Sequence, residues 1–241
     1  MPMLTPDYTG GGVLNLMSSL VAAQGGPATG YSGCSLLEGS DLGQARQVLL
    51  LVVDGLGWNY LNRVGAGGHL HSHCLGALSS VAPPTTAAAI PMFFTAAPPA
   101  LHGFTGWFTW LRELGCVSAV LPYVTRHGHL PLGDKSPGPL ELSQCEPVTN
   151  RLPVDCHVIS PRHIAHSVFN RGFSGGAEIH AYDDMNGFFA TVRDTLYSDT
   201  GRKYVHAYCA DLDTIAHVHG IGSNEALQHL EQFDYHFGRL L

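Results

Sequence analysis

The sequence predicts an α/β fold in which a doubly wound, mostly parallel sheet carries helices on both faces. First, six consecutive apolar residues at 48–53 end abruptly in Asp54-Gly55, the pattern of a buried parallel strand that delivers an acid to the carboxyl edge of a sheet. Second, strand-like and helix-like segments alternate between residues 156 and 241. Third, a chain of 241 residues with 45% hydrophobic residues can bury a sizeable core. We therefore predict one domain over residues 1–241, with a lid or insert at about residues 104–151.

Charge and cysteine usage argue against several classes of protein. A net charge of −7 from only 13% charged residues disfavours binding to a nucleic-acid backbone, because such binding needs a basic face. The six cysteines form no C-x-x-C pair and lie mostly in apolar segments, which favours reduced, buried thiols over a disulfide framework or a zinc cluster. Neither a secretory leader nor an apolar window of membrane-span length is evident, so we expect a soluble cytoplasmic protein without a membrane span.

The first third of the chain is expected to hold two helices and two strands. Apolar residues at helical spacing predict a helix over 13–23, within a lead-in rich in Gly, Ser and Pro. The strand at 48–53 is followed by a helix over 58–64 and a second short strand over 74–81. Asp54 has two interpretations: it is a functional carboxylate at the sheet edge, or it only caps the helix that follows.

The next stretch, Pro83-Pro84-Thr85-Thr86, has the character of a helix start, and an alanine-rich run continues from it to Thr95. A helix N-terminus presents unpaired N–H groups and a partial positive charge, which suit a phosphate group. One threonine here can serve as the N-cap, and the adjacent threonine then keeps a free hydroxyl.

Between Phe104 and Arg151 the pattern dissolves into Trp, Pro, Gly and short apolar pieces, with no helix of useful length. A loop of this length inside a compact domain is more often a functional lid than idle chain. Its aromatic residues line a substrate pocket or form a satellite core, and the satellite core is the preferred interpretation. These residues are Phe104, Trp107, Phe108 and Trp110.

The remaining chain alternates regularly between the two kinds of element. Strands are expected at 156–160, 177–182 and 204–210, and helices at 161–170, 184–197 and about 223–241. Strand–helix repeats of this spacing predict a parallel sheet covered on both faces.

After the strand at 204–210, Asp213 and His217 lie four residues apart, which brings both side chains to one side of a helical turn. A carboxylate and an imidazole that converge at a strand end can supply half of the ligand shell of a divalent ion. The alternative is a helix-start cap beside a core histidine.

Three motifs occur in a characteristic order. They are V-D-G at 53–55, the Pro-Pro-Thr-Thr helix start that leads on to His102-Gly103, and D-x-x-x-H-x-x-G over 213–220. This order resembles the nucleotide pyrophosphatase/phosphodiesterase branch of the alkaline phosphatase superfamily. The resemblance extends from about Asn15 to Gly220, nearly the whole chain.

The resemblance implies an alkaline phosphatase-like fold with a two-metal site, usually two zinc ions, and a threonine nucleophile. Matched by position, Thr86 would be the nucleophile and would bind the second zinc together with Asp54. Asp213 and His217 would bind the first zinc. The implied reaction is hydrolysis of a phosphodiester or pyrophosphate bond in a small phosphate ester or nucleotide-like substrate, through a phospho-threonine intermediate. His102 matches a structural position of the family.

The sequence departs from the family pattern in one respect. Members of the family have a later Asp-His pair, usually followed by Gly, and a more distant His, whereas no D-H-G is present here. We therefore expect a chain truncated at its C-terminus, inside the helix that follows the Asp213 motif. Two alternatives remain: a phosphomonoesterase on the same scaffold, and a catalytically silent fragment or binding module.

Overall fold

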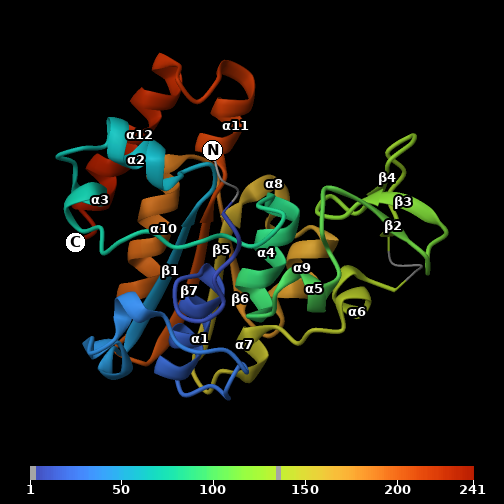
Figure 1. The fold of residues 1–241 in the computed structure, drawn as a ribbon, viewed down its shortest axis with the longest axis horizontal. Helices are drawn as coiled ribbons and strands as arrows, with labels where there is room; N and C mark the ends of the chain where they lie inside the picture. The colour runs from blue at the N-terminus through green and yellow to red at the C-terminus, as the bar shows by residue number, and fades with distance from the viewer. Residues whose placement is uncertain (1–3, 134–136) are drawn as a thin grey trace.

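The computed structural model describes residues 4–133 and 137–241, and Figure 1 shows its fold. The chain forms an α/β structure around a four-stranded parallel sheet, as the sequence predicted. Two short parts of the predicted domain, residues 1–3 and 134–136, lie outside the described residues, and the second of them belongs to the predicted insert.

The main sheet has the strand order β1-β7-β5-β6. Its members are β1 (Gln47–Val53), β5 (Asp155–Pro161), β6 (Glu178–Tyr182) and β7 (Lys203–Cys209). Each is a predicted strand whose ends differ from the prediction by at most about one residue, because long apolar runs bounded by turn residues mark buried strands clearly. The last of these strands along the chain, β7, lies between β1 and β5, with Gln47 opposite Lys203 and Val53 opposite Cys209.

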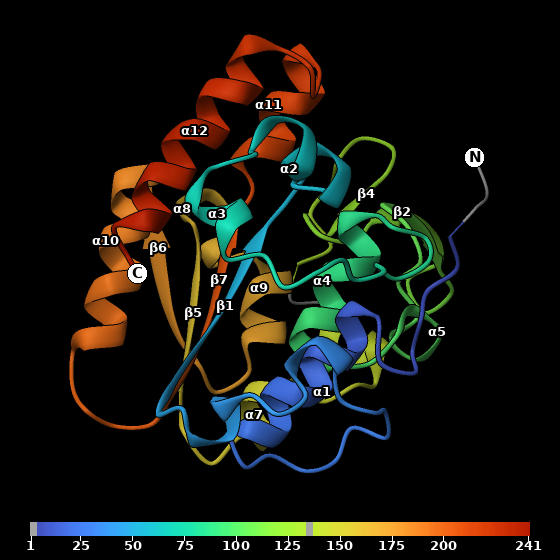
Figure 2. The same ribbon diagram turned by 60° about the vertical axis from the view of Figure 1, so that its left-hand side comes forward.

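Helices cover both faces of the main sheet, as Figure 2 shows. One face carries α1 (Val13–Ala23) and α4 (Thr86–Thr95), and the other carries α10 (Met185–Tyr197) and α12 (Asn224–Gly238). On the first face, Leu14 shares a buried core with Val48 of β1. On the second face, Phe188 shares a core with Val205 of β7. Apolar side chains on alternate strand positions thus fill both layers.

The other helices are short. They are α2 (Trp58–Val64), α3 (His69–Ser72), α5 (Pro99–His102), α6 (Pro139–Ser143), α7 (Val148–Arg151), α8 (Arg162–Ala165), α9 (Val168–Ser174) and α11 (Asp211–His219), with 3₁₀ turns at Ser35–Leu37 and Asp41–Gln44. The predicted starts of α10 and α12 are confirmed by side-chain caps. Asp184 accepts a hydrogen bond from the N–H of Gly187, and Ser223 accepts one from the N–H of Ala226.

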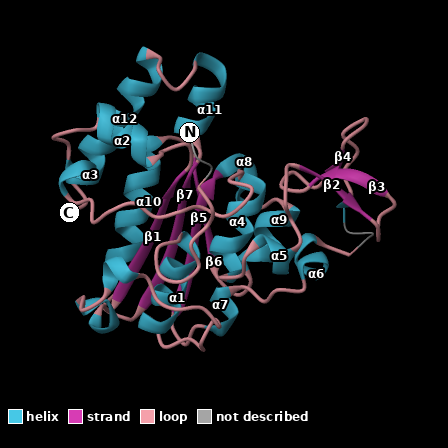
Figure 3. Ribbon diagram, viewed as in Figure 1, coloured by secondary structure: helices cyan, strands magenta, loops and turns pink. Residues whose placement is uncertain are grey.

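The predicted insert contains a second sheet that the sequence did not reveal. Its antiparallel strands are β2 (Phe108–Leu111), β3 (Cys116–Ala119) and β4 (Val124–Thr125), and Figure 3 shows them beside the main body. Strands of two to four residues are too short for a period of two to be recognised in the sequence. The small sheet is joined to the main body because Leu111 and Val120 share a buried core with Phe94 and Phe173.

Two sequence predictions are wrong. The expected strand over 74–81 is irregular chain with a single bridge, in which Ser79 pairs with the glycine-rich turn at Gly12. That turn offers hydrogen-bonding partners to one residue only, so no ladder forms. The expected helix over 161–170 is two helices, α8 and α9, because Ser167 adopts an extended conformation and caps α9 by accepting a hydrogen bond from the N–H of Asn170.

Within the described ranges, none of the helices has both the length and the apolar character that crossing a lipid bilayer requires. All six cysteines lie in these ranges and are free thiols. Cys34 and Cys209 are buried and Cys74 is exposed, whereas the other three are half-buried.

Candidate functional site

The strand order brings two acid-bearing segments together at the carboxyl edge of the main sheet. Strands β1 and β7 are parallel neighbours, and the N–H of Asp54 donates a 2.9 Å hydrogen bond to the carbonyl oxygen of Cys209. The segment that follows β1 therefore lies against the start of α11, which begins at Asp211. Sites of open α/β sheets lie at this edge, where successive strands deliver their loops.

The Asp54 carboxylate accepts three hydrogen bonds. Its Oδ2 accepts one from Thr86 Oγ1 at 3.1 Å and one from the Tyr208 hydroxyl at 2.7 Å, and its Oδ1 accepts one from the N–H of Gly55 at 3.0 Å. Asp54 is therefore not a cap of α2, whose N-cap residue is Gly57. The hydroxyl of Thr86, at the start of α4, points at this carboxylate.

The two adjacent threonines have different roles. Thr85 occupies the N-cap position of α4 with an extended backbone, and its carbonyl oxygen accepts from the N–H groups of Ala88 and Ala89. Its side chain makes no capping hydrogen bond. Thr86 is the first residue of α4 and directs its hydroxyl to Asp54. Thr85 holds the N-cap position as expected, but neither hydroxyl caps the helix, and the Thr86 hydroxyl is hydrogen-bonded to Asp54.

Asp213 and His217 face each other on α11. His217 Nε2 lies 3.5 Å from Asp213 Oδ2, and their side chains are 80% and 35% exposed, respectively. Burial raises the pKa of Asp213, the nearby negative charge of Asp54 raises it further, and His217 opposes the rise. Two carboxylates that repel each other beside an imidazole form a donor set that a divalent cation fits, because its charge relieves the repulsion.

Gly55 allows the two acidic segments to approach closely. Its φ is +80°, a left-handed conformation, and a Cβ at this position would lie 2.9 Å from the Cα of Asp213. Any other residue would strain the turn after β1 and push α11 away from it.

All four predicted site residues line one cavity of about 850 Å³. They are Asp54, Thr86, Asp213 and His217. A second cavity of about 500 Å³ adjoins it and shares Asp54, Thr86 and Asp213 with it. Apolar side chains form much of the second cavity's wall, among them Ile90, Phe94, Leu121, Ile164 and Phe169. The structure thus places a cavity that two acids line beside a more apolar one, and Thr86 lines both.

The aromatic residues of the insert divide between the two interpretations. Phe104 is buried in the core with Phe94, as a satellite core requires. Trp107 instead lines both cavities and is 47% exposed, while Phe108 and Trp110 are 46% and 61% exposed. The preferred core interpretation therefore holds for Phe104 and is wrong for the other three, of which Trp107 lines the cavities whereas Phe108 and Trp110 line neither of the two.

Sequence reasoning missed Tyr208 and His206. Both lie on β7, where Tyr204, His206 and Tyr208 alternate and carry polar atoms on an otherwise apolar strand. Burial raises the pKa of Tyr208 and so keeps its hydroxyl a donor to Asp54. Burial lowers the pKa of His206 to about 4, and its neutral ring packs 4.5 Å from the ring of Phe94 at the smaller cavity. The alternation itself was the available signal.

His102 supports α4 rather than the cavity. It is buried, and its Nδ1 accepts from the N–H of Phe104 at 3.1 Å, so its Nε2 carries the proton and donates to the carbonyl oxygen of Ala88. Burial lowers its pKa to about 4, in keeping with a neutral ring.

Three ligand-type side chains approach within 4.8 Å of one another at two further places in the described part of the chain. One group is His157, Glu178 and His180, and the other is Cys209, Asp211 and His229. Neither contains a residue predicted from the sequence as a metal ligand. Each group joins two residues that are close in sequence, Glu178 with His180 and Cys209 with Asp211, to a histidine from a distant element, so no sequence spacing reveals the complete group.

No family model matches the chain, and a comparison with curated proteins gave no significant match.

Proposed function

We propose that this protein is a metal-dependent hydrolase of phosphodiester or pyrophosphate bonds, with an alkaline phosphatase-like fold and Thr86 as its nucleophile. The observation that carries the proposal is the 3.1 Å hydrogen bond from Thr86 Oγ1 to Asp54 Oδ2, in a cavity that Asp213 and His217 also line. Carboxylate, hydroxyl and imidazole groups at one sheet edge are the donors that two-metal phosphoryl-transfer sites use.

Two pairs of side chains would hold two divalent ions, with zinc as the best match to their oxygen and nitrogen donors. Asp54 and Thr86 would hold one ion, and Asp213 and His217 the other. When bound, such ions lower the pKa of a hydroxyl and stabilise negative charge on a leaving oxygen.

Thr86 carries the covalent chemistry of the proposed reaction. Its Oγ1 forms a bond to phosphorus while the bond from phosphorus to the leaving oxygen breaks, and water then hydrolyses the phospho-threonine. The hydroxyl proton already points at Asp54 Oδ2, which is the nearest acceptor for it. α4 is ten residues long and starts at Thr86, so its N-terminal dipole faces the phosphate.

The apolar cavity favours a phosphodiester or pyrophosphate over a phosphomonoester. A diester carries a second substituent on phosphorus, and the apolar wall beside Thr86 offers that group a place to bury itself. A monoester has a single substituent, so it cannot fill this space and also place a leaving group elsewhere.

The test compares Thr86→Ala with Thr85→Ala in hydrolysis of an aryl phosphodiester. Thr86→Ala should lower the rate by at least about 10³-fold, because it removes the nucleophile, whereas Thr85→Ala should stay near the wild-type rate. The wild-type chain should hold about two metal ions and hydrolyse the diester faster than the matching aryl monoester. An inactive Thr85→Ala with an active Thr86→Ala would contradict the choice of nucleophile, and a metal-free, inactive wild-type chain would favour a silent binding module.

A further inference from the structure

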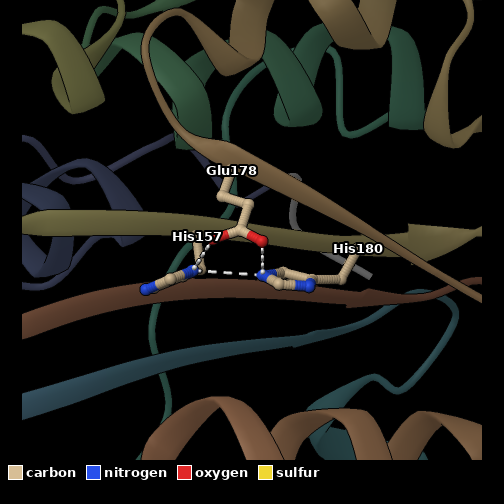
Figure 4. Close-up of side chains that lie close together, drawn as sticks. All are labelled: His157, Glu178 and His180. Atoms are coloured by element: carbon tan, nitrogen blue, oxygen red, sulfur yellow. Dashed lines mark hydrogen bonds and ion pairs between the residues drawn. The ribbon is translucent and has the colours of Figure 1, made fainter. Parts of the chain in front are cut away.

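A cluster of three ligand-type side chains lies where β5 pairs with β6, away from the candidate active site. His157 of β5 is the register partner of Glu178 of β6, and His180 follows Glu178 at two residues' distance. Because side chains two apart on a strand share a face, all three project from the same face of the sheet. Figure 4 shows the carboxylate of Glu178 and the two imidazole rings converging on one point.

The ligand atoms of the three residues lie close together. His157 Nδ1 lies 3.1 Å from His180 Nε2, Glu178 Oε2 lies 3.7 Å from His157 Nδ1, and the other carboxylate oxygen, Oε1, lies 3.9 Å from His180 Nε2. One ligand atom from each residue lies within 4.8 Å of the other two. Donors bound to one tetrahedral zinc ion at about 2.0–2.1 Å lie roughly 3.3–3.4 Å from one another. The observed separations lie on both sides of that value, so small side-chain rotations would bring all three atoms onto one ion.

We propose that His157, Glu178 and His180 bind a divalent transition-metal ion, with zinc as the best match to two imidazoles and one carboxylate. The fourth position is left to water, since the Glu178 side chain is 69% exposed and opens the cluster to solvent. The ion joins β6, the edge strand of the main sheet in the described order, to β5.

The chemistry around the cluster suits a cation. The Glu178 carboxylate supplies negative charge beside the two imidazole rings. Among the described residues, the nearby ammonium group of Lys203 forms an ion pair with Asp199 at 2.9 Å and donates to the carbonyl oxygen of Thr195, so its charge is compensated.

A direct hydrogen bond between the two rings is the competing explanation for the short nitrogen–nitrogen distance. That hydrogen bond needs no carboxylate, whereas a three-ligand metal site does. Replacing Glu178 therefore distinguishes the two explanations. Because the Glu178 side chain is exposed, the variant Glu178→Gln should fold normally.

The site is also separate from the candidate active site. Asp54 follows the carboxyl end of β1, whereas Glu178 is the first residue of β6 and His157 the third of β5. Metal binding at the cluster can therefore be tested without reference to hydrolysis.

The experiment measures zinc affinity by competition with a chromophoric chelator. It uses the 241-residue chain with Asp213→Asn and His217→Ala, which remove ligands of the candidate active site. Glu178→Gln and His180→Gln should each weaken binding at one site by at least about tenfold. Glu231→Gln and His127→Gln replace exposed residues of the same types and should leave the affinity unchanged. Unchanged affinity in Glu178→Gln, or equal losses in the control variants, would overturn the proposal.

Hydrogen exchange supplies a second readout. Zinc should slow exchange of the amides of β6 in the Asp213→Asn/His217→Ala chain, because an ion that bridges β5 and β6 disfavours local opening of the edge strand. Adding Glu178→Gln should abolish this protection. Zinc-dependent protection that persists in Glu178→Gln would show that the ion binds elsewhere.

Discussion

Asp213 and His217 are partly exposed and interact with each other at 3.5 Å, so the proposed function makes a clear prediction for each. Asp213→Asn and His217→Ala should weaken binding of one metal ion, and high zinc should restore part of the activity, because each variant loses affinity rather than the nucleophile. His219→Ala, on the same helix and exposed, is the matched control. The prediction is checked by measuring metal content and the rate of diester hydrolysis at a series of zinc concentrations. It would be contradicted if neither chelator nor added zinc changed the activity of the two variants.

Two buried histidines make the stability of the fold depend on pH. The pKa of both His102 and His206 is lowered to about 4 by burial, whereas an unfolded histidine titrates near 6.5. Below pH 6.5 these two histidines are protonated in the unfolded chain but stay neutral in the folded chain. The free energy of unfolding should therefore fall as the pH drops from about 6.5 to 4, by up to roughly 1.4 kcal/mol per pH unit for each histidine.

Urea unfolding at a series of pH values measures this slope. His206→Phe keeps a ring beside Phe94 and should flatten the slope, while His127→Phe, at an exposed position, should not. Equal slopes in wild type and His206→Phe would show that His206 takes up its proton without unfolding.

At the scale of elements, the approach of α11 to the end of β1 depends on one glycine. Gly55→Ala should destabilise the fold by more than the roughly 1–2 kcal/mol that a left-handed conformation costs a residue with a Cβ, because the new methyl would also meet Asp213. It should weaken zinc binding and diester hydrolysis together.

Gly67→Ala separates the effect of left-handed backbone strain from the effect of a contact with Asp213. Gly67 has a φ of +85°, close to that of Gly55, and its Cβ would meet no described atom within 4 Å. Chemical unfolding and zinc affinity of the two variants give the comparison. If Gly67→Ala loses as much zinc affinity as Gly55→Ala, the close approach to Asp213 has no role in the site.

The insert contributes Trp107 to both cavities. Removing the Trp107 side chain should weaken substrate binding and leave the rate of the chemical step nearly unchanged. Trp107→Ala should raise KM for an aryl diester roughly two- to tenfold with little change in kcat, the range expected for loss of one aromatic contact. Trp110→Ala, also in the insert and 61% exposed, should leave KM unchanged. Steady-state kinetics with both variants decide whether the insert touches the substrate.

Elements with a strong local pattern could be predicted from the sequence, and those held together by distant contacts could not. The run at β1 and the caps at Asp184 and Ser223 mark their elements locally. The small sheet of the insert depends on contacts with Phe94 and Phe173 of the main body, which no local pattern records. The segment at Ser167 differs from both. The apolar pattern there suggests one helix, but Ser167 caps α9 and so separates it from α8.

At the scale of the whole molecule, the candidate site follows from strand order as much as from its residues. Asp54, Thr86 and Asp213 could be proposed from sequence because each stands at the end of a strand or near the start of a helix. His217 could be proposed because it follows Asp213 at the spacing of one helical turn. The sequence does not encode the strand order in any local feature, so the contribution of Tyr208 from β7 to the carboxylate of Asp54 became visible only in three dimensions.

The central place of β7 also bears on the order of events during synthesis. Ribosomes deliver β1, β5 and β6 before β7, yet β1 pairs only with β7 among the described strands. Until Lys203–Cys209 has emerged, β1 has no partner in the main sheet, and its apolar residues stay open to chaperones or to aggregation. The nascent chain therefore adds β1 to its sheet late, and the pocket around Asp54 forms in the same step.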